Sequence, residues 1–366
     1  MYPNANLRIR KTMVPMTLLS SSRCQNTSAD PRTQASAGDR GLAGRVRDFT
    51  AVASASFDDL HVTRAAGVLV AVSGGRTVLN EPAAPSPCPL ARRMGGERVA
   101  SYLEQKVKRW GMFTPARRLL HHSTSVPFGA SEMLMRAVRR GVLDGAVVAC
   151  DGIGTFASRS PELVQGTGAR MNGLFHTTVY PEVVGRAASL GALLPEELSG
   201  KPDPAAGLRV AASAGLRRVG ITVAGNQADL IGSLRERAEG LGVEAVLLSV
   251  CNSGLSPGES MAAAKADIIW GCAAGPQLLR AVRGRIRLQL GVISPVFALT
   301  QAGVRLVRAS ISGEGPGILG DGGTLLGTPR EVPEGAPAGT LGPLRVVVAE
   351  GSELPRLWRN GGQVGV

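Results

Sequence analysis

Three cysteines share one kind of position, at the point where an apolar run ends and turn residues begin. Cys150 ends AVVAC, Cys251 ends VLLSVC and Cys272 ends IIWGC. Because the carboxyl ends of parallel strands meet at one edge of a sheet, where α/β proteins bind ligands, we expect these thiols to share a crevice. A thiolate in such a crevice is a nucleophile if a nearby cation or helix N-terminus lowers its pKa.

The same thiols also suggest a metal site. Cys88, Cys150, Cys251 and Cys272 would be its ligands, and zinc or an iron–sulfur cluster would be the cofactor. The chain has no CxxC spacing, so the alternative is that each cysteine is a small hydrophobic residue at the end of a buried strand. The five cysteines are odd in number and widely spaced, which argues against a disulfide framework and favours a reducing cytoplasm.

A polar, glycine-rich stretch follows Cys150, and we expect it to form a ligand-binding loop. Asp151 is the expected acid/base or orienting partner of Cys150, and His176 is the candidate general base, with a structural histidine as the alternative. Glycine exposes backbone N–H groups, and with an arginine these can clamp an anion. The expected ligand-binding residues are Glu162, Gly166, Gly168, Arg170 and Asn172. Their alternatives are a helix-start carboxylate for Glu162 and a tight loop with a solvated Arg170.

Composition narrows the classes of partner. The formal net charge is +13, but the basic residues are mostly scattered arginines without interleaved aromatic residues, a pattern that does not favour nucleic-acid binding. Hydrophobic residues make up 44% of the chain, yet no run has the length and purity of a membrane span. We therefore expect a soluble cytoplasmic protein whose partner is a small anionic metabolite, with no membrane and no nucleic acid involved.

Hydrophobic spacing places the elements around these residues. Val99, Leu103, Val107 and Trp110 have helical spacing, which predicts a helix over 96–110. A second helix is expected over 131–140, ending before Gly141 and followed by the strand at 146–149. Two apolar runs around 73–75 predict a hairpin. From 219 to 310 strands alternate with short helices, which is typical of a parallel sheet.

The expected fold class is therefore α/β, with a mostly parallel open sheet flanked by helices, in one body or in two lobes. Residues 1–45 are expected to be a disordered head, and 57–200 an N-terminal α/β lobe that carries the CDG motif and the glycine-rich loop. Residues 201–312 are expected to form a doubly wound C-terminal lobe. Residues 313–366 are rich in Gly and Pro and are expected to be a flexible tail with one strand at 344–348.

Several motifs resemble the methanogenesis marker protein 8 family, a group of uncharacterised proteins. They are CPL at 88–90, FTPAR at 113–117, VPFGASE at 126–132, CDGIGT at 150–155, PELVQGTGARMNGL at 161–174 and LQLGVISPVFALT at 288–300. They occur in order between about 57 and 312. The resemblance implies a role in methyl-coenzyme M reductase maturation or in coenzyme M-type sulfur metabolism. The chain departs from the family pattern at 179–181 and 271–275, and its Arg-, Ala- and Gly-rich composition and added tails are typical of a high-GC bacterium. These differences favour a role in cofactor metabolism over a direct role in methane formation.

These patterns lead to one hypothesis and two alternatives. The leading hypothesis is a protein that binds a small anionic, sulfur-containing metabolite, with Cys150 as nucleophile or ligand and Arg170 as part of the anion clamp. The first alternative is a non-catalytic assembly or maturation factor with a metalloenzyme as its partner. The second is a protein that carries a metal or an iron–sulfur cluster. The sequence names no substrate and no reaction class.

Overall fold

The computed structural model describes residues 41–310, except 66, 82–95, 124, 127, 170, 272–273 and 292–293. Beyond residue 310 it describes the backbone of 324–327, 338–341, 344–350, 356–359 and 362–365, and for 96–98 it likewise gives the backbone alone. Most of the expected disordered head therefore lies outside the described residues, as do Cys88, Arg170 and Cys272.

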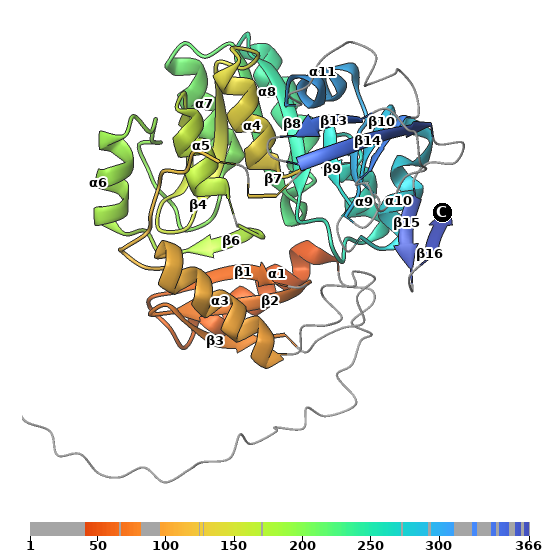
Figure 1. Ribbon diagram of the computed structural model, residues 1–366. Helices are drawn as coiled ribbons and strands as arrows, with labels where there is room; N and C mark the ends of the chain where they lie inside the picture. The colour runs from red at the N-terminus through yellow and green to blue at the C-terminus, as the bar shows by residue number, and fades with distance from the viewer. Residues whose placement is uncertain are drawn as a thin grey trace, which may run out of the picture. The chain divides into compact units, whose positions relative to one another are not determined.

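A large mixed sheet runs through the described chain (Figure 1). The four strands at its centre are parallel to one another, and the strands beside them are antiparallel. In spatial order the strands are β13 (Ala338–Leu341), β14 (Leu344–Glu350), β12 (Thr324–Gly327), β10 (Leu288–Leu290), β11 (Val296–Ala298), β9 (Ile268–Trp270), β8 (Glu244–Val250), β7 (Arg218–Ala224), β4 (Gly145–Cys150) and β5 (Gly154–Ser158).

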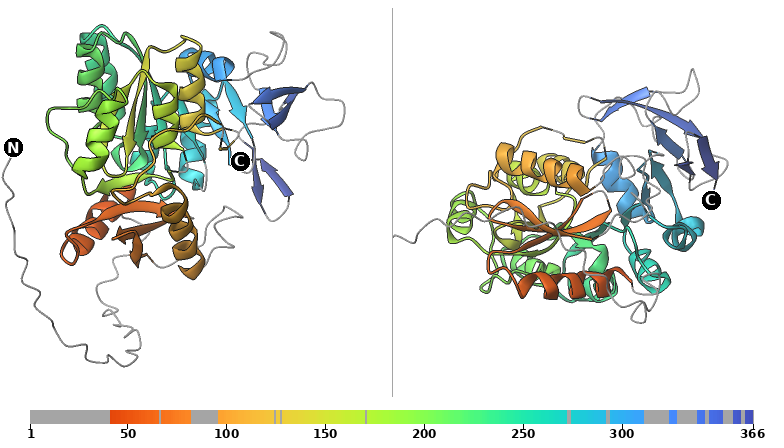
Figure 2. Two further views of the ribbon diagram at one scale, coloured as in Figure 1. Left: turned by 60° about the vertical axis from the view of Figure 1, so that its left-hand side comes forward. Right: turned by 90° about the horizontal axis from the view of Figure 1, so that it is seen from below.

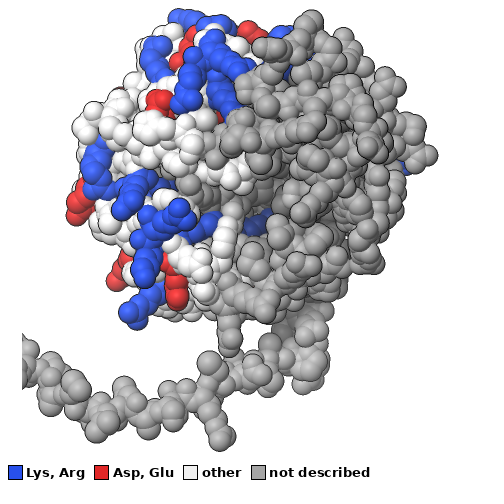
Figure 3. All heavy atoms as spheres, in the orientation of Figure 1, with Lys and Arg blue, Asp and Glu red and all other residues white. Residues whose placement is uncertain are grey.

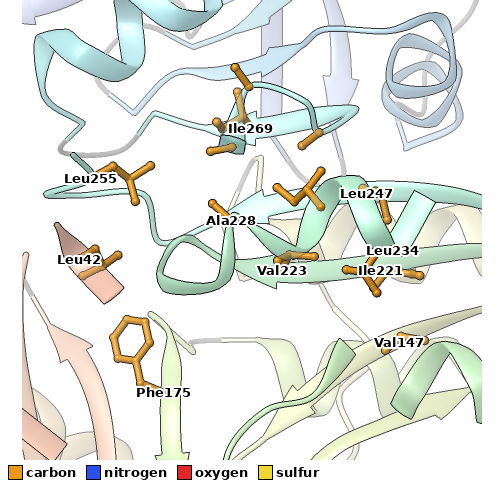
Figure 4. Close-up of a cluster of buried hydrophobic side chains, with 14 of the residues drawn as sticks. Leu42, Val147, Phe175, Ile221, Val223, Ala228, Leu234, Leu247, Leu255 and Ile269 are labelled. Carbon is orange, nitrogen blue, oxygen red and sulfur yellow. The ribbon is translucent and has the colours of Figure 1, made fainter. Parts of the chain in front are cut away.

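Helices cover both faces of this sheet, and each face has its own hydrophobic core. One core, part of which Figure 4 shows, joins the strands to the helices α7 (Pro204–Ser213), α8 (Leu230–Gly240), α9 (Pro257–Ala263) and α10 (Pro276–Val282). The short 3-10 turns are η2 (Gly225–Gln227) before α8 and η3 (Arg283–Arg285) after α10. The other core joins the strands to α4 (Ala130–Arg139), α5 (Pro161–Gly168), α6 (Pro181–Ser189) and α11 (Gln301–Ser310). The central strands are buried on both sides, as parallel strands usually are. The predicted α/β fold class is confirmed.

A smaller antiparallel sheet is built from β3 (Arg76–Asn80), β2 (Val68–Ser73), β1 (His61–Ala65) and β6 (Leu174–Thr177), in that order. The helix α3 (Gly96–Trp110) packs along β3, and α1 (Leu42–Ser54) packs along β2 (Figure 2). The hairpin predicted around 73–75 is the β2–β3 turn, and the helix predicted over 96–110 is α3.

Helix α1 begins inside the segment that was expected to be disordered, so that boundary was wrong. Leu42 and Val46 are buried in the core that contains α7–α10. Both carboxylate oxygens of Glu259 accept hydrogen bonds from the first turn of α1, from Leu42 N at 2.8 Å and from Ala43 N at 2.7 Å. Glu259 also accepts a hydrogen bond from Ser256 N at 2.7 Å, so one carboxylate caps the N-termini of α1 and α9.

Two other expectations about architecture were wrong. The parallel strands follow one another as β4-β7-β8-β9, without the reversal of order that defines a doubly wound sheet. The strand predicted at 344–348 is β14. The rest of the tail was expected to be flexible, but it contributes β12 and β13 to the large sheet, and β15 (Arg356–Arg359) pairs with β16 (Gly362–Gly365). Strands from both expected lobes lie in the large sheet, and Arg40–Val366 form one compact unit.

Some of the arginines donate hydrogen bonds to the unpaired carbonyls at a helix C-terminus. On the face shown in Figure 3, Lys and Arg side chains gather in groups with few acidic residues among them. Arg136 Nη1 donates to Ser310 O at 3.0 Å and Arg140 Nη1 donates to Ala309 O at 2.6 Å, both at the last turn of α11. Cations at a helix C-terminus stabilise its unpaired carbonyls. No helix in the described part of the chain is long and apolar enough to cross a bilayer.

Asp144 ties the start of β4 to the start of β7, and acid should loosen this connection. Its carboxylate accepts hydrogen bonds from Arg217 N at 2.9 Å and Arg218 N at 2.8 Å, and the Arg218 guanidinium contributes most to lowering the pKa of Asp144 from 3.8 to about 2. The stabilisation is present above pH 3.8 and is lost as the pH falls towards 2. We expect Asp144→Asn to flatten this part of the stability–pH profile, measured by urea unfolding. An unchanged profile would contradict the role given to Asp144.

Candidate functional site

The carboxyl ends of the parallel strands β4 and β8 face the small sheet. Arg64 on β1 donates from Nη1 to the carbonyl of Cys251, the residue after β8, at 3.1 Å. Thr63, also on β1, donates to the carbonyl of Gly173 at 2.5 Å. The carboxyl edge of a parallel sheet is where α/β proteins bind ligands, and here the small sheet and α3 bring additional side chains to that edge.

Five residues form a continuous series of contacts at this edge, and we call them the strand-edge site: Arg64, Tyr102, Lys106, Asn172 and Cys251. Arg64 contacts the Cys251 carbonyl, and the Cys251 thiol donates to the carbonyl of Asn172 at 2.5 Å. Asn172 Nδ2 donates to the Tyr102 hydroxyl at 3.4 Å, and Lys106 Nζ lies 4.4 Å from the centroid of the Tyr102 ring. Asn172 and Cys251 were predicted as site residues, and the structure brings them together.

Cys251 has an unusual backbone conformation, with φ at +60°. Residues other than glycine rarely have a positive φ, and those that do concentrate at functional sites. A Cβ atom on Gly173 would lie 2.7 Å from Cys251 Sγ, so glycine at 173 is what lets the thiol approach the chain so closely. Burial raises the pKa of the Cys251 thiol to about 11, and the positive charges of Arg64 and Lys106 oppose that rise.

The two cations of the strand-edge site are buried, with only 3% of Arg64 and 4% of Lys106 exposed. Burial lowers the pKa of Lys106, while Tyr102 and Asp151 act in the opposite direction. Neither cation was singled out from the sequence, although a signal was present. Lys106 stands among the apolar positions of α3, three residues after Leu103 and four before Trp110, and Arg64 interrupts a buried strand. Buried charges are rare without a specific role.

Cys150 and Asp151 lie beside this site in a closed polar core. Asp151 is fully buried and accepts hydrogen bonds from Phe113 N at 2.5 Å and from Arg117 Nε at 2.7 Å. Arg117 also donates to the carbonyls of Gly166 and Thr167, each at 3.1 Å. This arrangement supports a structural ion pair better than an acid/base catalyst, because both carboxylate oxygens already accept strong hydrogen bonds. Arg117 belongs to the FTPAR motif but was not predicted to contact Asp151.

The Cys150 thiol is not activated in this structure. It is fully buried, and its Sγ lies 3.2 Å from the carbonyl oxygen of its neighbour Asp151. Burial raises the pKa of the Cys150 thiol far above its usual value, with the positive charge of Arg117 opposing the effect. A nucleophilic cysteine needs a lowered pKa, so this geometry favours the alternative reading of Cys150 as a buried strand-end residue.

The expected glycine-rich loop was wrong, because 161–168 forms the helix α5. Ser160 caps it by accepting a hydrogen bond from Leu163 N at 3.2 Å, and Pro161 occupies its first position. In a helix the backbone N–H groups at 166 and 168 bond to the preceding turn and are not exposed to an anion. A Cβ atom on Gly166 would lie 1.8 Å from the Leu119 carbonyl oxygen, so the glycine allows close packing.

The remaining predicted residues lie apart from the strand-edge contacts. Glu162 is in the first turn of α5 and forms an ion pair with Arg139 at 2.9 Å. Burial raises the pKa of Glu162, but the hydrogen bond from Arg139, a backbone hydrogen bond and the nearby positive charges together lower it overall. His176 is half-buried on β6 opposite Val62, and burial lowers the pKa of its imidazole. The structure places neither side chain against Cys251 or Asp151, and the roles proposed for them stay predictions.

The metal site predicted from the four cysteines also stays a prediction, since Cys88 and Cys272 fall outside the part of the chain that is described. Within that part, no three His, Cys, Asp or Glu side chains lie close enough together to hold a metal ion. Cys150 is buried and Cys251 is half-buried, and both are free thiols. The strands that carry them are separated by β7, so two inter-strand spacings, about 10 Å, lie between them.

A small hollow opens beside the Asp151–Arg117 pair, with a volume of about 150 Å³. It is lined by Trp110, Arg117, Arg118, Leu120, His121, Gly166 and Ala169. Gly166 was a predicted ligand-binding residue, and it contributes to this hollow through the packed surface of α5 and not through an exposed loop. Arg118, an exposed cation, and the half-buried His121 make the lining basic.

Comparison with known proteins places the chain in a family without a described activity. Residues 61–312 match the family model described as "Uncharacterized protein conserved in archaea (DUF2099)". The chain is also 30% identical over 257 residues to the uncharacterized protein MJ0054 of Methanocaldococcus jannaschii, an alignment that covers 68% of this chain and 89% of that protein. The matched range contains both sheets' central strands and every residue of the strand-edge site. The chain therefore belongs to this family of uncharacterized proteins conserved in archaea.

Proposed function

We propose that the protein binds a small anionic metabolite at the strand-edge site. The observation that carries this proposal is that two buried cations lie with the half-buried Cys251 at the carboxyl edge of a parallel sheet: Arg64 donates to the Cys251 carbonyl, and Lys106 lies over the Tyr102 ring. Arginine and lysine at the carboxyl edge of a parallel sheet can bind the oxygens of an anionic ligand through charge-assisted hydrogen bonds. The amide of Asn172 and the hydroxyl of Tyr102 add neutral donors.

The chemistry of the site favours a carboxylate, phosphate or sulfonate of small size. Arg64 presents a planar group that suits the paired oxygens of such anions, whereas Lys106 presents a compact charge. Cys251 places a polarisable thiol beside them, which suits a ligand that contains sulfur. In this proposal Cys251, and not Cys150, is the thiol that meets the ligand, because Cys150 is enclosed next to Asp151.

The resemblance to the methanogenesis marker protein 8 family suggests a metabolic setting for this ligand. The motifs that carry it include FTPAR, CDGIGT and the segment 161–174, which supply Arg117, Asp151 and Asn172 to the region just described. We propose that the ligand belongs to coenzyme M-type or methyl-coenzyme M reductase-related metabolism in the cytoplasm. A sulfonate that also carries a thiol is the ligand class that this setting and the side chains of the site have in common.

A binding measurement on matched variants tests the proposal. We expect sulfate and ethanesulfonate to raise the melting temperature of the full chain and to bind measurably in calorimetry. Arg64→Leu and Lys106→Met should each weaken binding about tenfold to a hundredfold, because a hydrogen bond to a charged group contributes about 1.5–3 kcal/mol. Lys108→Met is the control, since Lys108 lies on the same helix and is exposed.

The outcomes separate clearly. Loss of binding in Arg64→Leu and Lys106→Met, with binding retained in Lys108→Met, supports the strand-edge site. Equal affinity in the wild type and in all three variants would show that the strand-edge site is not the binding site. Because each variant loses a buried charge, its fold is checked by circular dichroism before the affinity is compared.

A further inference from the structure

A series of hydrogen bonds links the exposed carboxylate of Asp59 to Gly152 in the turn after β4, and His61 is at the centre of this series. His61 is fully buried, its Nε2 lies 2.8 Å from the Tyr180 hydroxyl, and its Nδ1 lies 2.7 Å from Thr177 Oγ1. Tyr180 donates to Asp59 at 2.6 Å, and Thr177 Oγ1 accepts from Gly152 N at 2.8 Å. The Asp59 side chain is 37% exposed, so one end of this series of hydrogen bonds reaches solvent.

The direction of each bond follows from what each group can donate. Burial raises the pKa of Asp59, but hydrogen bonds from Tyr180 and Gly74 N and the charge of His61 together lower it overall, so Asp59 is the acceptor of the Tyr180 hydrogen. The Tyr180 oxygen then accepts from His61 Nε2–H. Neutral His61 therefore carries its proton on Nε2, and its bare Nδ1 accepts the hydroxyl hydrogen of Thr177. In this state each of the four hydrogen bonds from Asp59 to Gly152 has one donor and one acceptor.

The same heavy atoms also satisfy a protonated His61. With a proton on Nδ1, the imidazolium donates to Thr177 Oγ1, and the Thr177 hydroxyl hydrogen turns to the carbonyl of Thr178, which lies 3.1 Å away. Tyr180 still accepts from Nε2–H and still donates to Asp59. A buried histidine normally resists charging because a hydrogen-bond acceptor is missing, and here an acceptor is present on each side.

The groups that face His61 set how readily it charges. Burial lowers its pKa, and the half-buried His176 on the neighbouring strand lowers it further. Asp59, whose Oδ1 is 3.5 Å from Nε2, and Asp151 at the end of β4 oppose that effect. Phe113 is the aromatic neighbour, with its ring centroid 5.5 Å from that of the imidazole. A change in local charge can therefore move His61 between its two states.

We infer that His61 is the proton-exchanging group of the strand-edge site and that it takes up a proton when an anion binds there. The inference rests on the proposed function, since it assigns a coupled proton to that same site. His61 and Arg64 are three residues apart on β1, so their Cα atoms are about 10 Å apart and their side chains leave the strand on opposite faces, where the two charges act on each other through the small sheet. An anion beside Arg64 favours the charged imidazole, and by linkage the charged imidazole favours the anion.

A histidine-labelled NMR titration of the full chain measures this directly. The sequence contains four histidines, and the His61 signal is assigned with His61→Gln. We expect the His61 pKa to lie below 6.5, to fall further in Tyr180→Phe, which weakens the connection to Asp59, and to rise when sulfate is added. A His61 that does not titrate before the protein unfolds, or whose pKa is unmoved by bound sulfate, would overturn the inference.

Sulfate affinity as a function of pH gives a second readout, because sulfate itself does not titrate between pH 8 and pH 5.5. We expect the wild-type protein to bind sulfate about threefold to tenfold more tightly at the lower pH, as an added charge about 10 Å away implies. His61→Gln should bind with little pH dependence, and His176→Gln should retain the wild-type dependence. Binding that is present but equally pH-independent in wild type and His61→Gln overturns this inference alone, whereas no sulfate binding at either pH removes the proposed function as well.

Discussion

Asp151→Ala is expected to lower the free energy of unfolding by about 3–5 kcal/mol. The substitution leaves the Arg117 guanidinium buried without its carboxylate, and it leaves Phe113 N without the acceptor at 2.5 Å. Arg117 also holds the carbonyls at the end of α5, so its displacement would loosen the packing of that helix against β4. Urea unfolding followed by circular dichroism measures the loss.

Two companion variants show whether the loss comes from the buried pair. Asp151→Asn keeps one oxygen and should cost less than Asp151→Ala. Glu244→Ala removes one partner of an ion pair with Arg305 whose side chains are 60% and 62% exposed, and it should change stability by less than about 1 kcal/mol. A similar small effect for Asp151→Ala would mean that the pair does not stabilise the fold.

Gly166→Ala is expected to cost about 3 kcal/mol, near the upper end for overpacking in a closed interior. The new Cβ atom would lie 1.8 Å from the Leu119 carbonyl oxygen and 2.4 Å from its carbon, and a backbone group cannot move aside as a flexible side chain can. The Gly166 carbonyl accepts from Arg117 at 3.1 Å, so a shift of α5 would also disturb the Asp151–Arg117 pair.

Gly232→Ala is the matched control for this prediction. Gly232 lies in α8, and apart from the neighbouring turns of its own helix no heavy atom lies within 4 Å of a Cβ atom added there. Alanine is the better helix former, so this variant should gain about 0.5–1 kcal/mol. If both alanines stabilised the protein by similar amounts in thermal unfolding, the close contact between α5 and Leu119 would not exist as described.

The parts of the fold that could be predicted from the sequence are those in which local spacing and burial agree. The strand that ends at Cys150 is a continuous apolar run, and α3 shows apolar residues at helical intervals. Glycines at 74 and 75 have positive φ angles in the β2–β3 turn, as the hairpin requires. In each case one physical reason is sufficient, and no distant residue changes the outcome.

The candidate site depended on tertiary contacts and was predicted only in part. Cys251 and Asn172 were found because their chain positions are informative, but Lys106 and Arg64 belong to elements whose burial is set by the partner they pack against. The segment 161–168 was misread because its glycines were taken as a sign of exposed backbone. The helix start Ser160-Pro161-Glu162 was the stronger signal, since it supplies a cap and a favourable first turn.

Helix α1 has a consequence for the smallest unit that can be produced. The region that matches the family model starts at residue 61, after α1 ends. A fragment trimmed to that region would lose the buried Leu42, Val46 and Ala53 and would leave Glu259 without the two amide donors that α1 supplies. Such a fragment should expose an apolar surface and aggregate on expression, whereas one that begins before residue 41 keeps that surface covered.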